Sequence, residues 1–399
     1  MTTIVFSIVA VLALATLLFA PFTRGQLWRA TVTPLASIIG SGFLVSAPLL
    51  AREFGGYAAL AMALLIMLAA LIGWTIRYNI TVVENELAHG TDRALMSIEK
   101  LSHVVLAFAY FISVAYYLFL LGHFVVAAFN IDSASMPQII AITLLAAIGI
   151  LGWSGGVAKI TQIERYTSAL NLAVIIGFLA ALAAYGVDLF VQDQPVLPPP
   201  GRFELSSLPV LLGLLIVVQG FETTRFTGDN FDQVTRARAM WIAQLVSGVI
   251  YVAFFVLLSP LLTELSLGTG VAAIITLSTV VAAILPLSLT VAAAASQFSA
   301  SVADSLGDAG LIEQITEGKV NPSHAYPLIA AVGIAILITI DVNSVIALAS
   351  RAFALFYALQ CLVAWESVRK KVGETFKTVA FMVLALISFA VFIFGVPAG

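Results

Sequence analysis

An apolar stretch near the start of the chain carries three small residues at its centre, where exposed backbone groups could bind a ligand. The stretch reads PLASIIGSGFLVSAP at residues 34–48 and places Gly40, Ser41 and Gly42 in its middle. Glycine weakens a helix because it adds backbone entropy and exposes peptide groups. In a bilayer, such groups are tolerated only where they face protein or a water-filled cavity. The stretch therefore predicts either a ligand site at a helix break or a notch for a closely packed neighbouring helix.

A second apolar stretch, residues 209–232, carries polar side chains as well as a glycine. It reads PVLLGLLIVVQGFETTRFTGDNFD and holds Gln219, Gly220 and Glu222. Glutamate and glutamine are costly inside a membrane and usually face a protein interior or a cavity. Glu222 could pair with an amine, carry a proton or gate a site, and Gln219 could bind a polar group of a ligand. The alternative for Glu222 is a structural hydrogen bond to a neighbouring helix.

The composition places both stretches in a membrane protein. The chain has 399 residues, of which 61% are hydrophobic and 10% charged. Apolar runs of about 20 residues, each long enough to cross the hydrocarbon core, recur along it. Its single cysteine, Cys361, excludes an internal disulfide. Neither a phosphate-binding loop nor histidines at metal-ligand spacing are present, so we expect an all-α integral membrane protein that is not an enzyme and needs no cofactor.

About twelve transmembrane helices are expected. The first apolar run, residues 3–20, lacks a positively charged start and a small-residue cleavage site, so we interpret it as a retained leading helix. Eleven core helices follow, numbered 1 to 11, at residues 30–50, 56–78, 100–128, 137–157, 165–187, 206–227, 238–263, 275–303, 325–341, 344–366 and 377–396.

The basic residues fall mainly on one side of these helices. Arg52 and Arg202 lie on the other side, and Arg351 lies within core helix 10. The remaining 15 of the 18 are Arg24, Arg29, Arg77, Arg93, Lys100, Lys159, Arg165, Arg225, Arg236, Arg238, Lys319, Arg369, Lys370, Lys371 and Lys377. Because lysine and arginine are enriched in cytoplasmic loops, both termini are predicted to lie outside the cytoplasm. The expected location is a cell membrane, and the compact loops fit a bacterial inner membrane.

The two interrupted helices occupy corresponding positions of two halves. Five helices separate their starts, and because five is odd, the second five-helix unit must enter the membrane inverted. Paired interruptions in inverted halves indicate a transport site at the membrane midplane. The predicted divisions are 1–27 for the leading helix, 28–190 for the first repeat, 191–370 for the second repeat and 371–399 for a trailing helix.

Four segments, in this order, resemble motifs of the amino acid–polyamine–organocation superfamily. They are IIGSGFLVSAP (38–48), QGFE (219–222), GDNFDQVTRARAM (228–240) and SLGDAGLIEQITEGKVNPSHAYP (305–327). The third lacks the usual Asn-Pro and later Pro, and the fourth has Asp-Ala-Gly where Asp-Gly often appears. The resemblance covers roughly residues 28–396 and implies the leucine-transporter-type fold of five plus five inverted helices, with core helices 1 and 6 discontinuous.

The resemblance also implies which residues form the substrate site. Unwound backbone of helices 1 and 6 and an aromatic residue of helix 3 would line it. Of the neighbouring Tyr116 and Tyr117, at most one is expected to face it, because they point about 100° apart on a helix. The implied substrate-binding residues are Ile39, Gly40, Ser41, Gly42, Tyr116, Tyr117, Val218, Gln219, Gly220 and Glu222.

A coupling-ion site is implied on core helix 8. Ser296 and Ser299 share one helix face, and in sodium-coupled members such hydroxyls bind sodium together with helix 1 carbonyls, here those of Ala36 and Ile39. Proton-coupled relatives often carry a lysine at this place in helix 5, where this chain has Asn171. Sodium and a proton both remain candidates, and the serines could instead bond only to their own helix.

Arg351 is an unusual charge within a spanning helix. An arginine there must pair, snorkel or face water. It could contact an anionic substrate or close an outer gate against a carboxylate, and the alternative is a structural ion pair.

These features predict a secondary active transporter that moves a small amino acid or related amine by alternating access. One alternative is an uptake transporter for an inorganic cation such as potassium, and another is a receptor or scaffold that does not transport. The expected partners are a small-molecule substrate and the lipid bilayer, without nucleic acid, and no oligomeric state is assigned.

Overall fold

The protein is almost entirely helical. The computed structural model describes residues 1–399 except 91, 156–163, 194–197, 229, 269, 271 and 397–399, and the described residues contain no β-strand. Its α-helices are α1 (Thr2–Phe19), α2 (Gln26–Phe54), α3 (Ala58–Tyr78), α4 (Glu84–His89), α5 (Arg93–Ala128), α6 (Met136–Trp153), α8 (Glu164–Val191), α9 (Leu208–Leu212), α10 (Gln233–Leu257), α11 (Leu262–Leu267), α12 (Ala273–Leu277), α13 (Leu285–Ile315), α14 (Pro322–Thr339), α15 (Val342–Val368) and α16 (Thr375–Phe394).

The expected spans are accounted for within the described chain. Ten helical stretches there are long and apolar enough to cross a membrane. One of them, Gln26–His89, contains both α2 and α3. The interrupted segment around Gly220 is not among the ten, because its helical pieces are short. Counting α2 and α3 separately and adding this segment gives the twelve predicted spans.

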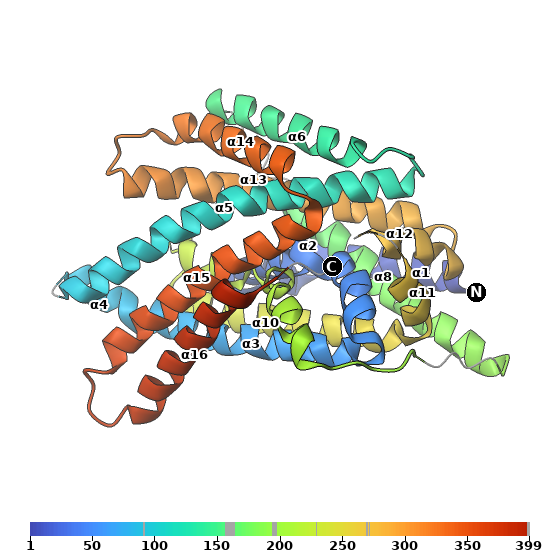
Figure 1. The fold of residues 1–399 in the computed structure, drawn as a ribbon, viewed down its shortest axis with the longest axis horizontal. Helices are drawn as coiled ribbons and strands as arrows, with labels where there is room; N and C mark the ends of the chain where they lie inside the picture. Colours follow the sequence, from blue (N-terminus) through green and yellow to red (C-terminus); the bar gives the residue numbers. More distant parts are fainter. Residues whose placement is uncertain are drawn as a thin grey trace.

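The helices pack into a bundle around α2 and the interrupted segment. Helix α2 contacts α10, α13 and α8, whereas α5 packs along α13 and α15. In Figure 1, α6 and α14 lie outside the layer formed by α5 and α13, and α15 and α16 run together as a hairpin. The leading helix α1 packs along α8, where an added Cβ at Gly177 would meet Ala10 and Phe6.

Short polar side chains begin several of the long helices. Asp92 accepts hydrogen bonds from the backbone N–H groups of Ala94 and Leu95 at the start of α5. Asp232 and Asp341 do the same for α10 and α15. These caps satisfy amides that have no partner within the helix. They therefore help to fix the residues at which α5, α10 and α15 begin.

The predicted break in core helix 1 is wrong. Helix α2 runs uninterrupted from Gln26 to Phe54, through Gly40 and Gly42. An added Cβ at Gly42 would lie within 3.0 Å of Val217, so the small residues permit close approach of the interrupted segment. Of the two interpretations of this stretch, the structure supports the packing notch.

The predicted break in core helix 6 is confirmed. Helix α9 gives way to a 3₁₀ segment, Leu215–Val218, and a second one, Phe221–Phe226, follows. The two residues between them, Gln219 and Gly220, are not helical.

Several predicted helix ends are wrong. Helix α13 begins at Leu285, after α12 and a 3₁₀ turn, and continues to Ile315, whereas residues 275–303 were expected. Much of the segment expected to be a loop, 305–327, is therefore helical. Helix α5 begins at Arg93, before the expected residue 100, because Asp92 caps it.

Candidate functional site

The break between the two 3₁₀ segments is built around Gly220. Gln219 is extended, with φ −80° and ψ 173°, and Gly220 has φ +113°. L side chains rarely adopt that φ, so glycine is favoured here. An added Cβ would also lie within 3.0 Å of Ser37 on α2. Residue 220 thus combines a positive φ with close contact to the neighbouring helix.

The carboxylate of Glu222 folds back onto this break. Its Oε2 accepts hydrogen bonds from the Gly220 N–H at 2.9 Å and from the Tyr357 hydroxyl of α15 at 2.8 Å. Glu222 is fully buried, and its Oε1 has no hydrogen-bond partner among the described residues. A buried acceptor without a partner is costly. This oxygen is therefore available to a ligand that donates a hydrogen bond.

One of the two predicted tyrosines contacts the break directly. The Gln219 Nε2 donates a 2.6 Å hydrogen bond to the Tyr117 hydroxyl. The ring of Tyr116 lies 5.3 Å from that of Tyr117, and both residues are fully buried. Helix α5 thus places the Tyr117 hydroxyl against the interrupted segment.

A tyrosine of α10 joins α2 to the segment before the break. The Tyr251 hydroxyl lies 2.6 Å from the Val217 carbonyl and 3.1 Å from the Ile38 carbonyl. Val218 lines a small cavity with Tyr251 and Gln244. The Tyr251 hydroxyl thus joins a carbonyl of α2 to a carbonyl of the 3₁₀ segment, near the place where Gly42 permits α2 to approach that segment.

Three of the predicted ion-binding residues line one cavity. Ala36, Ser296 and Ser299 line a small cavity of about 40 Å³. Its wall also includes the polar residues Thr33, Ser37, Thr167, Ser168, Thr223 and Asp304. A cavity of this size can hold water molecules or a small ion. Hydroxyls and a carboxylate are hard oxygen donors, which suit small cations that take oxygen ligands.

The remaining predicted residues of α2 line a neighbouring cavity of about 20 Å³. Ile39, Gly40 and Gly42 face it together with Ser296, which lines both cavities. Asn171 donates a 3.2 Å hydrogen bond to the Ser296 hydroxyl. Asn171 therefore touches the predicted ion-binding serine directly. The backbone of Ser41 continues α2, and its side chain lies outside the described part of the structure.

Two buried aspartates lie one turn apart on α13. The Ser113 hydroxyl of α5 donates to Asp304, which also lines the larger cavity. Asp308 is fully buried, and neither of its carboxylate oxygens has a hydrogen-bond partner among the described residues. Asp304 thus lines the cavity that Ser296 and Ser299 also line, and it lies one turn from the buried carboxyl group of Asp308.

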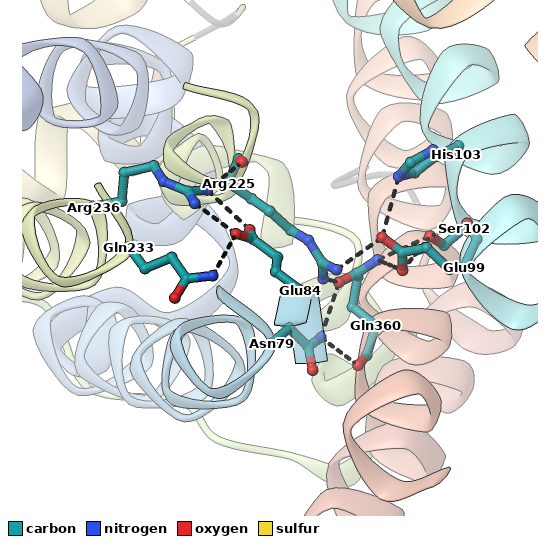
Figure 2. Close-up of polar contacts among 9 residues, drawn as sticks. All are labelled: Asn79, Glu84, Glu99, Ser102, His103, Arg225, Gln233, Arg236 and Gln360. Carbon is teal, nitrogen blue, oxygen red and sulfur yellow. Dashed lines mark hydrogen bonds and ion pairs between the residues drawn. The ribbon is translucent and has the colours of Figure 1, made fainter. Parts of the chain in front are cut away.

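A buried polar network joins four parts of the chain beyond the break. Figure 2 shows Arg225, from the segment after Gly220, reaching Glu99 at 2.8 Å and also bonding to Gln360. The amide of Gln360 donates to Glu99 and to Ser102 of α5, and Asn79 donates to Gln360. Breaking one partner of a buried ion pair leaves an uncompensated charge. The network therefore fixes α5, α15 and the interrupted segment together.

A second ion pair lies beside this network. Arg236 of α10 contacts both carboxylate oxygens of Glu84, at 2.9 and 2.5 Å, and donates to the Arg225 carbonyl. Gln233 also donates to Glu84. The residues of both clusters come from the side on which most basic residues were predicted.

Arg351 does not take part in these clusters. Its Nε donates a 2.7 Å hydrogen bond to the Phe392 carbonyl of α16, and its guanidinium lies 5.8 Å from the Phe392 ring. These contacts favour a structural role for Arg351 among the alternatives.

Sequence reasoning did not identify Tyr251, the Glu99–Arg225 pair or the contact of Tyr357 with Glu222. Glu99 and Arg225 are charged residues near apolar runs, which is a signal for a buried pair. They are 126 positions apart, however, and only the crossing of their helices brings them together.

Comparison with known proteins agrees with this architecture. A family model described as APC superfamily transporter matches residues 20–395. An uncharacterized protein of Aquifex aeolicus (strain VF5) is 39% identical over 381 residues, 94% of this chain and 92% of that protein. The crystal structure of a mutant manganese transporter from Eremococcus coleocola is similar with a TM-score of 0.54 at 12% identity, covering 94% of this chain and 88% of that one.

The last similarity shows a shared fold, and the family match spans nearly the whole chain. The chain belongs to the amino acid–polyamine–organocation (APC) superfamily of transporters.

Proposed function

We propose that this membrane protein moves a small amino acid or related amine by alternating access. One observation carries the proposal: Glu222 is fully buried at the helix break, and its Oε1 has no hydrogen-bond partner among the described residues. An ammonium group supplies N–H donors and a compensating charge to such an oxygen. The Tyr117 hydroxyl and Gln219 lie at the same break and supply further polar groups.

Recognition of a substrate carboxylate needs a change in this arrangement. The N-terminal end of a half-helix favours an anion, but the Gly220 N–H here already donates to Glu222. A substrate carboxylate would have to replace Glu222 at that amide. The amine end of the substrate is therefore the better supported part of the proposal.

Coupling to a sodium ion or a proton would use the cavity between α2 and α13. The hydroxyls of Ser296 and Ser299, with Asp304, form an oxygen-rich wall. Sodium would take these oxygens as ligands, whereas a proton would be carried by the Asp304 carboxylate. The cavity lies beside the break and is lined in part by α2, so binding of a sodium ion or a proton there would affect the packing of α2.

Alternating access would require the buried network around Glu99 and Arg225 to open. In the present arrangement the pair ties α5 to the segment after the break. Opening a path on this side would separate charges that are now buried together. The network is therefore the proposed gate on the predicted cytoplasmic side.

Uptake of an inorganic cation is the second candidate. The free Oε1 of Glu222 suits a cation as well as an amine, and a protein of similar fold is a manganese transporter. Manganese favours several carboxylate or carbonyl ligands. No group of three or more histidine, cysteine or acidic residues able to hold a metal occurs in the described part of the chain. The amine is therefore favoured.

The two candidates are separated by a thermal-stability screen of the purified protein. The panel contains amino acids, polyamines, potassium and manganese, each with and without sodium. A ligand that binds only the folded state raises the melting temperature. A shift from an amino acid or amine supports the proposal. A shift from a metal cation alone would favour cation uptake and make Glu222 a ligand of the cation.

A further inference from the structure

A long groove lies on the surface between α3 and α10. It has a volume of about 670 Å³. Its apolar walls include Ala63, Met67 and Ala70 of α3 and Leu245, Val249 and Val252 of α10. Met67, Leu245 and Val249 are half or more exposed, so this face meets lipid in a membrane protein. The groove extends along α10 from Trp241 to Val256, about 22 Å at the helical rise.

A positive charge closes one end of the groove. The Nη1 of Arg77 donates a 2.7 Å hydrogen bond to the Gln244 Oε1, and Gln244 Nε2 donates to the Ala69 carbonyl at 2.7 Å. Gln244 lies flat against α3 because residue 73 is glycine, since an added Cβ there would lie within 3.0 Å of its amide. Gly73 and Gln244 together hold the guanidinium at the groove.

The charge of Arg77 has no compensating partner within the described residues. No carboxylate there lies within ion-pair distance of it, and its guanidinium makes one hydrogen bond although arginine has five N–H donors. A guanidinium near lipid must pair, snorkel or face water. A phosphate group offers it charge and bidentate acceptors.

We propose that this groove binds a phospholipid with an anionic headgroup. One acyl chain lies between α3 and α10, and the phosphate contacts Arg77. The groove is long enough, because one leaflet of the hydrocarbon core is only about 15 Å thick. Trp241, which lines the groove and is half exposed, has the ring type enriched at the membrane–water interface. Arg77 belongs to the predicted cytoplasmic set, where anionic lipids are bound by basic pockets between helices.

A second copy of the chain fits this groove less well. A two-fold dimer brings the same patch of both subunits together. The lining of the groove contains no aspartate or glutamate, so each Arg77 would meet no opposite charge. The uncompensated arginine therefore favours the lipid over a symmetric dimer.

The test uses delipidated protein in an uncharged detergent. Phosphatidylglycerol and phosphatidylcholine are titrated separately, and the melting temperature and the lipid retained in native mass spectrometry are measured. Phosphatidylglycerol should raise the melting temperature more than phosphatidylcholine does. Arg77→Gln should weaken its apparent affinity about fivefold, as expected for one basic residue. Arg77→Lys should keep most of the effect, and Arg93→Gln, an exposed charge outside the groove, should keep all of it.

A second variant tests the apolar part of the site without changing the charge. Ala70 is exposed and lines the groove, so Ala70→Phe should fill it and weaken phosphatidylglycerol binding while the lipid-free protein stays folded. Equal lipid responses in wild type, Arg77→Gln and Ala70→Phe would overturn the proposal. A concentration-dependent dimer that Ala70→Phe abolishes would assign the groove to a second copy instead. If Arg77→Gln does not fold, Arg77→Lys and Ala70→Phe decide the outcome.

Discussion

The Tyr357 hydroxyl of α15 donates a 2.8 Å hydrogen bond to Oε2 of Glu222, the carboxylate that also accepts from the Gly220 N–H at the helix break. The two residues are 135 positions apart. Their contact holds one carboxylate oxygen in place, and the other has no hydrogen-bond partner among the described residues. The candidate site is therefore built on a contact between two residues that the sequence pattern did not pair.

Replacing Glu222 by glutamine should abolish most ligand binding. The variant loses the charge that pairs with an amine, and hydrogen bonds to charged groups contribute about 1.5–3 kcal/mol, equivalent to a roughly tenfold to hundredfold loss of affinity. Tyr357→Phe should cost less, about fivefold, because the carboxylate remains and one ordinary hydrogen bond is lost. The affinity for the best ligand of the stability screen is the measurement, and exposed Tyr166→Phe is the control. Unchanged affinity in Glu222→Gln would remove Glu222 from the site.

Gly42→Ala should destabilise the protein. The added Cβ would meet both the side chain and the Cα of Val217, and overpacking typically costs about 1–3 kcal/mol. Val217→Ala should relieve this cost only in part, because the backbone contact remains. Thermal unfolding of the two single variants and the double variant measures the coupling.

Gly186 on α8 is the matched control for this glycine. An added Cβ there meets no atom within 4 Å. Gly186→Ala should therefore be neutral or slightly stabilising, since alanine is the better helix former. An equal loss of stability from both glycine substitutions would contradict the packing notch at Gly42.

Ser299→Ala should remove stabilisation by sodium if the cavity between α2 and α13 is the coupling site. The variant takes away a hydroxyl that lines the cavity. Ser296→Ala should act similarly but also leaves Asn171 without its hydroxyl partner. The melting temperature in sodium is compared with that in potassium, and Ser288→Ala, at a partly exposed position of the same helix outside the cavity, is the control. Absence of a sodium effect in the wild-type protein would favour the proton instead.

Glu99→Gln should lower stability more than the double change Glu99→Gln with Arg225→Gln. The single change leaves the Arg225 guanidinium buried without its charge partner, which typically costs about 3–5 kcal/mol. Removing both charges avoids that penalty. Thermal unfolding of the double-mutant cycle is the measurement, with the partly exposed pair Lys371 and Glu86 as a control whose coupling should be small. Additive effects at Glu99 and Arg225 would refute the pairing.

Asp92 should contribute stability that is lost in acid. The hydrogen bond from Lys370 and those from the α5 backbone lower the pKa of Asp92 below its usual value. Its contribution is therefore complete above the unfolded-state pKa and disappears as pH falls through the lower folded-state value. Asp92→Asn should melt lower than wild type at neutral pH and converge with it in acid. Asp132→Asn, in an exposed loop, should leave the pH profile unchanged.

The sequence alone determined the class of fold, the order of the spans and the break at Gly220. These features are local: lipid offers the backbone no hydrogen-bond partners, so each span must be an apolar helix, and a glycine beside buried polar residues marks where a helix is interrupted. The same reasoning could not decide whether Gly40 and Gly42 interrupt the helix, because small residues permit both unwinding and close packing. Only the tertiary structure, in which α2 is continuous and Val217 packs against Gly42, decided for packing.

The tertiary structure alone decided which polar groups meet. Tyr357 with Glu222, Arg225 with Glu99, and Arg77 with Gln244 are separated by 135, 126 and 167 positions. Periodicity gives little information about these pairs, because helices buried on most faces are apolar all round. The crossing of the packed helices places each donor beside its acceptor, and with it fixes the carboxylate at the break, the buried ion pair and the charge at the end of the groove.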